Sequence, residues 1–238
     1  MSKHADAHFE ALRRRALRWL AAGTLGAPAG LWLLPAARAQ TRPGRLPAGR
    51  SIHAIEGQVT INGAPATAGS RITAADRIET GPDGRLVFAV GQDAFLLRPR
   101  SGLTLAGSGA VVETLRLVTG KLLTVFARRP HVVQTPVATI GIRGTGVYVE
   151  AEPDQSYVCT CYGQTEIAAA ADPGTREEIS TTHHDAPRYV VAQGGSVAIR
   201  PAPMKNHTDD ELFLLEALVG RTPPFDPADY ETPRRRRY

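Results

Sequence analysis

The chain has 238 residues, a formal net charge of +5 and only two cysteines. Residues 1–39 hold six Lys or Arg and two acidic residues, so they carry +4 of that charge and the rest of the chain is close to neutral. A basic surface for nucleic acid is therefore not expected, and two cysteines cannot build a disulfide framework.

Residues 1–39 predict an export signal. A cluster of arginines at residues 13–18 precedes an apolar run at residues 19–37, and a small-residue cleavage site follows between Ala39 and Gln40. The paired arginines resemble the twin-arginine signal, which exports folded proteins and would permit a metal to be loaded before export. We therefore expect a periplasmic protein without a stable transmembrane span. If the signal is not cleaved, the same run would anchor the protein in the inner membrane.

Residues 40–50 are rich in Pro, Gly and Arg and predict a flexible leader. Residues 51–200 predict a β-domain, because short strand-like runs recur about every ten residues between Gly-rich corners. The clearest runs are 58–61, 86–90, 94–97, 103–105, 114–118, 121–126, 131–134, 146–151, 157–162, 188–191 and 196–199. This pattern is typical of an all-β fold, which could be a wound sheet, a sandwich or a β-helix-like domain.

Residues 201–238 predict one short α-helix followed by a basic tail. Thr208 and Glu211 have the spacing of a capping box, and Gly220 is placed to end the helix. An apolar face follows the cap, formed by Leu212, Leu215, Leu218 and Val219. Because a helix of about a dozen residues is marginal in water, we expect this face to dock on the β-domain and to bring His207 with it.

The chain after residues 223–224, both prolines, predicts a loose arm that ends in the arginine run at residues 234–237. A solvated tail and weak attraction to an anionic lipid surface are both compatible with these arginines.

Four segments of the β-region resemble the FecR domain, the periplasmic β-domain of iron-dicitrate-type signalling regulators. They are EGQVTING (56–63), ADRIETG (75–81), LLRPRS (96–101) and VQTPVATIGIRGTGVYV (133–149). The last segment carries the family motif residues Thr135, Pro136, Arg143, Gly144 and Thr145. It departs from the family pattern in having Ile142 for Val and Val147 for Phe.

The resemblance implies a FecR-type sensing or protein-binding domain of the cell envelope that is not an enzyme. Its partner would be an envelope protein such as the signalling domain of an outer-membrane receptor. Only about 12 residues precede the arginine cluster, so the cytoplasmic sigma-regulating segment usual in the family is not expected. Within residues 133–149, Pro136 predicts a strand end and Gly144 a corner, whereas Arg143 could pair with a buried acid or cap carbonyl groups.

The two cysteines are the strongest candidates for chemistry. Cys159 and Cys161 are two residues apart in a predicted strand, so both sulfurs should lie on one face, at the edge of disulfide reach. His183, His184 and His207 could complete a site for a soft or borderline metal such as Zn or Cu. The first interpretation is nevertheless a pair of small buried cysteines with surface or capping histidines and no cofactor; a metal site and a redox dithiol are the alternatives to it. A periplasmic metal-binding or thiol-redox protein is therefore the alternative function.

Overall fold

The computed structural model describes residues 44–226. The predicted export signal, its cleavage site at Ala39 and Gln40, and the arginines at 234–237 lie outside the described residues. The all-β prediction is confirmed, because the described residues form fourteen strands and one short helix. No helix among residues 44–226 is long and apolar enough to cross a membrane.

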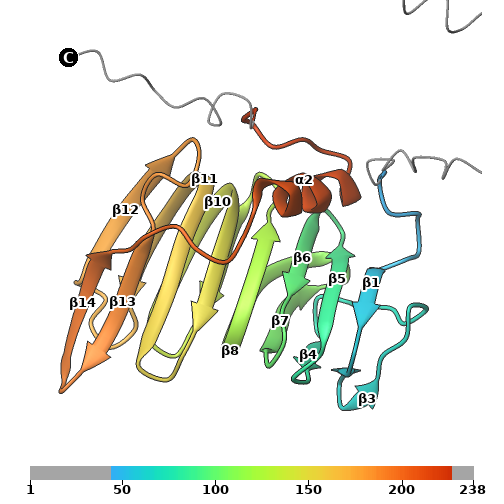
Figure 1. Ribbon diagram of the computed structural model, residues 1–238, viewed down its shortest axis with the longest axis horizontal. Coiled ribbons are helices and arrows are strands. Elements are labelled where there is room, and N and C mark those ends of the chain that lie inside the picture. Colours follow the sequence, from blue (N-terminus) through green and yellow to red (C-terminus); the bar gives the residue numbers. More distant parts are fainter. Residues whose placement is uncertain (1–43, 227–238) are drawn as a thin grey trace, which may run out of the picture. The chain divides into compact units, whose positions relative to one another are not determined.

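The strands extend from Ile52 to Pro201 (Figure 1). They are β1 (Ile52–Glu56), β2 (Val59–Ile61), β3 (Ala64–Pro65), β4 (Arg77–Thr80), β5 (Arg85–Val90), β6 (Asp93–Leu97), β7 (Gly102–Ser108), β8 (Val111–Val125), β9 (Pro130–Gln134), β10 (Ala138–Ala151), β11 (Gln155–Ala169), β12 (Arg176–Thr181), β13 (Arg188–Gln193) and β14 (Ser196–Pro201). All neighbouring pairs are antiparallel except β8 and β9, which are parallel.

Three long strands fold the sheet into two halves. β8, β10 and β11 each contain one glycine in the left-handed region: Gly120 (φ 92°), Gly144 (φ 56°) and Gly163 (φ 92°). Glycine adopts this conformation without a Cβ penalty, so each strand bends there while both of its arms remain paired. The sequence runs 114–118 and 121–126, predicted as separate strands, are therefore the two arms of β8.

The two halves have different strand orders. One half, which we call helix-covered because the short helix packs on it, has the strand order β1-β5-β6-β8-β10-β11-β13-β14. It contains the parts of β8 and β10 that follow their left-handed glycines and the part of β11 that precedes Gly163. The opposite half is β3-β2-β4-β7-β8-β9-β10-β11-β12, using the other three arms. Large apolar side chains from both halves, including Phe88, Phe95, Leu103 and Leu115, form one buried cluster. This arrangement is sandwich-like, and it is not closed into a barrel.

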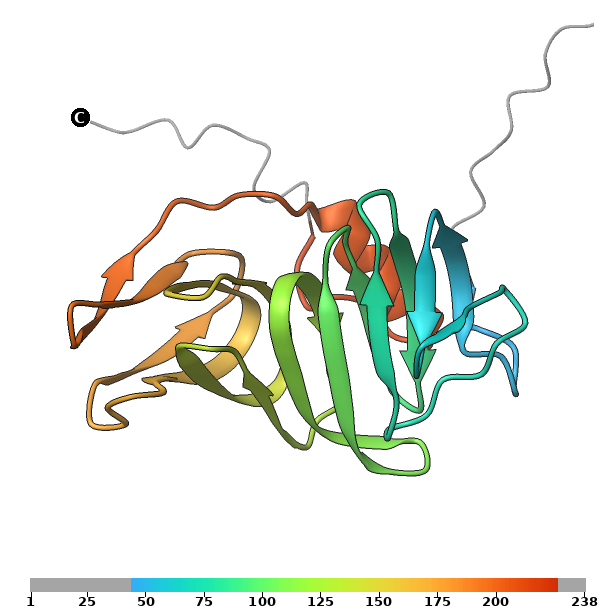
Figure 2. The same cartoon turned by 90° about the horizontal axis from the view of Figure 1, so that it is seen from below.

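A second apolar layer covers the other face of the helix-covered half. It contains Val87 and Leu96 from the sheet together with the helix α2 (Asp209–Leu218). Figure 2 shows α2, and the segment that leads to it, on one side of the strands. Strands of this half such as β5 and β6 are therefore buried on both faces, which explains their continuous apolar runs.

The predicted helix and its docking are confirmed. Thr208 is the N-cap, the capping box with Glu211 is present, and Gly220 follows with a φ of 75°. The predicted apolar face is buried, with exposed fractions of 9% or less at Leu212, Leu215, Leu218 and Val219.

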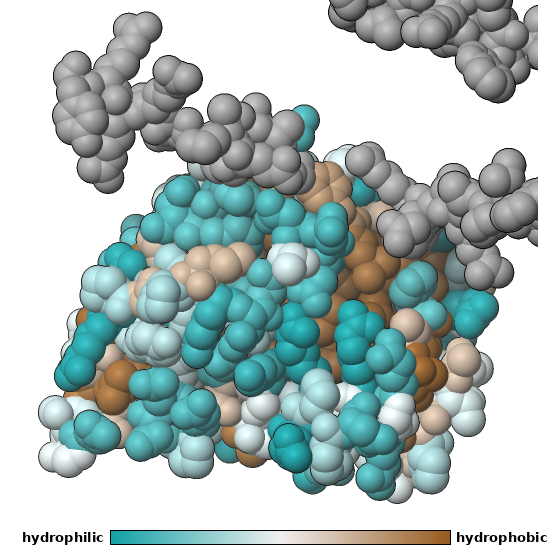
Figure 3. Space-filling view, viewed as in Figure 1, coloured by the Kyte–Doolittle hydropathy of each residue, from teal (hydrophilic) through white to brown (hydrophobic). Residues whose placement is uncertain are grey.

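Described residues at both flanks of the domain contact α2, whereas the flexible leader and the loose arm stay predictions. The amide of Leu46 donates to the carbonyl of Leu218 at 2.9 Å. Phe225 packs against Phe213 and Tyr162, with ring centroids 5.8 Å apart in both pairs. Figure 3 shows this face as largely hydrophilic, with apolar side chains visible beside α2 over β5.

Candidate metal centre

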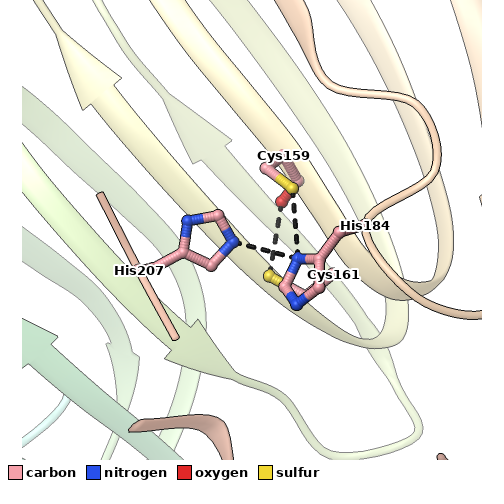
Figure 4. Close-up of side chains that lie close together, drawn as sticks. All are labelled: Cys159, Cys161, His184 and His207. Carbon is pink, nitrogen blue, oxygen red and sulfur yellow. Dashed lines mark hydrogen bonds between the residues drawn. The ribbon is translucent and has the colours of Figure 1, made fainter. Parts of the chain in front are cut away.

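Two cysteines and two histidines meet between the helix-covered half of the sheet and the segment that precedes α2. Cys159 and Cys161 lie on β11, and strand alternation places both in the outer apolar layer, each with no exposed surface. His184 comes from the turn between β12 and β13, and His207 directly precedes the N-cap of α2. Figure 4 shows the two sulfurs and the two rings directed toward one another.

The four side chains are close enough to share one ligand. One donor atom from each of the four residues lies within 4.8 Å of the other three. Nδ1 of His184 is 3.0 Å from Nε2 of His207 and 3.5 Å from Sγ of Cys159. The Cys161 thiol contacts the carbonyl oxygen of Cys159 at 3.7 Å. Two sulfurs and two imidazole nitrogens at these separations make the donor set of a small tetrahedral site.

Hydrogen bonds outside the cluster fix the ring of each histidine. Nδ1 of His207 lies 2.7 Å from the carbonyl oxygen of Lys205, which can only accept, so Nδ1 carries the proton and Nε2 presents a lone pair. Nε2 of His184 donates to Asp209 at 3.0 Å and leaves Nδ1 facing the cluster. A carbonyl or carboxylate behind the outer nitrogen is the usual partner of a metal-binding histidine.

The cluster shifts the pKa values of Cys159, Cys161 and His184. The hydrogen bond from Cys161, together with His184 and His207, lowers the pKa of Cys159 to about 4, although burial opposes the shift. Burial and the neighbouring Cys159 raise the pKa of the Cys161 thiol. Burial alone would lower the pKa of His184, but Cys159 and Asp209 outweigh it and raise that pKa above 6.5. These shifts favour the thiolate form of Cys159 and the protonated form of the neighbouring His184 ring.

His183 does not belong to the four-residue cluster, which corrects the predicted donor set. His184 has a φ of 50°, so the backbone turns there and the side chains of His183 and His184 point in different directions. Nε2 of His183 lies 2.9 Å from both carboxylate oxygens of Asp209, and its ring packs against Phe225 at 4.6 Å. His183, His184 and Asp209 form a second, less buried group of possible metal ligands.

The sequence analysis did not identify three residues that support the cluster. Asp209 is an acidic residue in the first turn of α2, and it accepts hydrogen bonds from both His183 and His184. The Tyr148 ring stacks on the His207 ring, with centroids 4.5 Å apart. Glu150 accepts from Tyr148 and Asn206, each at 2.7 Å, and from Lys205 at 2.9 Å. Strand alternation could have pointed to Tyr148 and Glu150. Together with Gly146 they lie on one face of β10, and Val147 and Val149 lie on the other face.

The FecR-type motif residues form a turn and a corner away from the cluster. The Thr135 amide donates to the Ala138 carbonyl at 2.9 Å, so Pro136 lies in the turn between β9 and β10, as predicted. The Thr135 hydroxyl accepts from the Ala138 amide at 2.9 Å and from Ser156 at 2.7 Å, which closes the turn.

The corner lies further along β10. Thr145 is fully buried beside Gly144, and its carbonyl accepts from the Phe126 amide at 3.0 Å. Arg143 is exposed, so it does not pair with a buried acid, which was one of the two roles considered for it.

No family model matches this chain, and no curated protein matches its sequence. The solved structures similar to it include two crystal structures of a "putative anti-sigma factor" from Parabacteroides distasonis, at 1.65 and 2.50 Å resolution. Their identities are 13% and 14%, and their TM-scores are 0.43 and 0.44. The match spans 52% of this chain and 59% of each of those chains. At this level of similarity neither structure establishes a shared function.

Proposed function

We propose that this chain is an exported FecR-like domain that binds a protein partner in cell-envelope signalling and is not an enzyme. The observation that carries the proposal is the position of the motif at residues 133–149. Its Thr135–Pro136 turn and its Gly144 corner shape the strand β10, which belongs to both halves of the sheet. Two features of the resemblance, the Thr135–Pro136 turn and the Gly144 corner, thus lie on a strand that both halves of the sheet share.

The partner binds at the open edge formed by β14. This strand ends the helix-covered half and pairs with β13, from Arg188 opposite Pro201 to Gln193 opposite Ser196. Its central residues are half-buried, so an added strand would cover apolar side chains as well as backbone groups. Strand addition at such an edge is a common mode of peptide and domain recognition. The signalling domain of an outer-membrane receptor is the partner that the FecR resemblance favours.

Site-specific crosslinking in intact cells tests this proposal. A photoreactive amino acid at Ala198 of β14 should capture a discrete envelope protein, because this residue lies at the proposed edge. The matched control is the same amino acid at Glu178 of β12, which is exposed at the edge of the opposite half. Equal capture at both positions, or none at Ala198, would contradict binding at this edge.

Export by the twin-arginine route is tested separately. Replacing Arg13 and Arg14 by Lys keeps the charge but removes the paired guanidinium groups. The precursor should then accumulate in the cytoplasm, as measured by cell fractionation. Normal periplasmic amounts of the double variant would instead indicate the general secretory route.

A further inference from the structure

We propose that Cys159, Cys161, His184 and His207 bind one tetrahedral transition-metal ion, with Zn²⁺ the best match. We further propose that this ion fastens the segment before α2 to the sheet. The proposal does not depend on the signalling role and rests on the contacts of these four residues.

In the neutral rings, the nitrogen atoms that face the cluster have no N–H donor as a partner; the Cys159 thiol, 3.5 Å from Nδ1 of His184, is the donor beside them. The outer nitrogens of His184 and His207 donate to Asp209 and to the Lys205 carbonyl, so their inner nitrogens both present lone pairs. These inner nitrogens are only 3.0 Å apart. Two lone pairs at that distance repel each other unless a cation lies between or beside them. A proton on one ring relieves this repulsion, and a metal ion beside both nitrogens relieves it while also binding the sulfurs.

Charge favours the metal in this environment. The two cysteines have no exposed surface, and His184 and His207 are at least nine-tenths buried. Two thiolates and two neutral imidazoles around a divalent ion form a site with no net charge. Without the ion, the pocket holds two thiols and two imidazoles in contacts of 3.0–3.7 Å, and any charge that forms on one of them lies in an apolar layer, where it is costly.

The donor types select the metal. Thiolate and imidazole ligands suit Zn²⁺ and Cu⁺, whereas Ca²⁺ and Mg²⁺ prefer oxygen ligands. The neighbouring group of His183, His184 and Asp209 offers two nitrogens and a carboxylate, but its nitrogen–oxygen distances of 2.9–3.0 Å are those of hydrogen bonds. Asp209 therefore orients the histidines in this structure, and the sulfur-containing set is the better site.

A bound ion would link three parts of the chain that are distant in sequence. β11 supplies the sulfurs, the turn after β12 supplies His184, and the segment before α2 supplies His207. This segment is also fastened by Lys205 and Asn206 to Glu150 and by the Tyr157 hydroxyl to the Pro203 carbonyl. The metal would add a bond at the end of the segment nearest the helix cap, so its occupancy should control how tightly α2 is held.

The first experiment measures metal in protein exported by its own signal. Elemental analysis should find close to one equivalent of zinc. After chelation under reducing conditions, Co²⁺ should produce a thiolate-to-metal charge-transfer band and intense tetrahedral ligand-field bands, and Zn²⁺ should displace it. Bound Zn²⁺ should also protect both thiols of the unmodified chain from alkylation, a readout that requires no variant.

Variants then assign the ligands. Cys159→Ser and His207→Gln should each weaken Zn²⁺ binding by at least about 100-fold, since each removes a direct ligand. The matched control is His183→Gln, because His183 lies next to a ligand in the chain but directs its ring toward Asp209 and Phe225, outside the four-residue set; this variant should cost at most about tenfold. Circular dichroism of each variant distinguishes loss of a ligand from loss of the fold.

Hydrogen exchange tests the link to α2. Zn²⁺ should slow amide exchange in residues 209–218 of the wild-type chain but not in Cys159→Ser. Unchanged exchange in a fully loaded wild-type protein would overturn the fastening role.

Three other results would overturn the metal site itself. The first is a zinc content well below one equivalent together with the absence of a cobalt–thiolate band. The second is metal binding that survives Cys159→Ser but is lost in His183→Gln. The third is a reversible Cys159–Cys161 disulfide in a protein that binds no metal when it is reduced.

Discussion

The two faces of the helix-covered half of the sheet differ in the kind of side chain they carry. The inner face packs against the opposite half through aliphatic side chains and phenylalanine, for example Phe88 and Phe95, whose stacked rings are 4.8 Å apart. The outer face, formed by the alternate residues of the same strands, carries tyrosine, cysteine and glutamate beneath histidine and α2.

Within a single strand, residues that stabilise the inner core therefore alternate with residues that could carry chemistry. On β11, Val158 lies in the inner layer while Cys159 lies in the outer one. The inner layer is held on both sides by the continuous strands β8, β10 and β11, whereas the outer layer is closed by one ten-residue helix and the segment before it. The outer layer should therefore relax, titrate and open more readily than the inner one.

The largest expected effect comes from removing the cover of the outer layer. A chain that ends before Met204 loses α2 and four buried aliphatic side chains, each contributing roughly 1.5–3 kcal/mol before chain entropy is subtracted. Its free energy of unfolding, measured by urea denaturation, should fall by several kcal/mol. The strands themselves should still fold, because the inner layer is intact. A truncated chain that melts like the full one would mean that the outer layer adds no stability.

Adjacent leucines on β6 compare the two layers directly. Leu97 lies in the inner layer and Leu96 in the outer one, and neither has exposed surface. Leu97→Ala should cost about 3–5 kcal/mol and Leu96→Ala about 2–3 kcal/mol, because the cost of a cavity falls where the surroundings can collapse into it. Equal losses in urea denaturation would show that α2 is as rigidly held as the opposite half of the sheet.

The corners that join the halves should be sensitive to a single side chain. Gly144 has a φ of 56°, and a Cβ built there would lie 3.1 Å from the Arg128 side chain. Gly144→Val should therefore lower stability by about 1–3 kcal/mol. Gly141→Val is the control on the same strand, since its φ is not positive and its nearest Cβ contact is 3.9 Å. An effect of the same size at both glycines would rule out the corner as its cause.

The smallest expected effect is on the stability of the chain at acidic pH. Burial acts to raise the pKa of Glu150, but hydrogen bonds from Asn206, Lys205 and Tyr148 outweigh it and hold that pKa below 4.5. A carboxyl group with a depressed pKa stabilises the fold above its unfolded value and loses this contribution as the pH falls through its folded value. The wild-type chain should thus lose stability below about pH 4.5. Glu150→Gln should remove part of this pH dependence at a cost of about 0.5–1 kcal/mol near neutrality; an unchanged acid profile would contradict this role.

The sequence predicted those features that depend on local pattern. Period-two alternation located most of the strands and placed both cysteine sulfurs on one face, and the capping box at Thr208 located α2. Because the cap fixes where the helix begins, it also fixes His207 beside the docked surface, and in the structure a donor atom of His207 lies within 4.8 Å of both sulfurs.

Features that depend on unusual backbone angles could not be read in the same way. A glycine such as Gly120 within a strand pattern predicts a break, but the structure uses it as a bend within one strand. The choice between His183 and His184 depends on the positive φ of His184, for which histidine gives no strong signal. The role of Asp209 depends on the docking of α2, so its effect on the helix dipole was the only part visible locally.

The position of His207 also has a consequence for synthesis of the protein. Residue 207 of 238 is made long after Cys159 and Cys161, and domains generally fold from the N-terminal end as the chain emerges. A nascent chain can thus assemble its strands while two reactive thiols are still uncovered. An interrupted translation product would expose both sulfurs to oxidants and to foreign metals, so completion of the last helix is also the step that protects them.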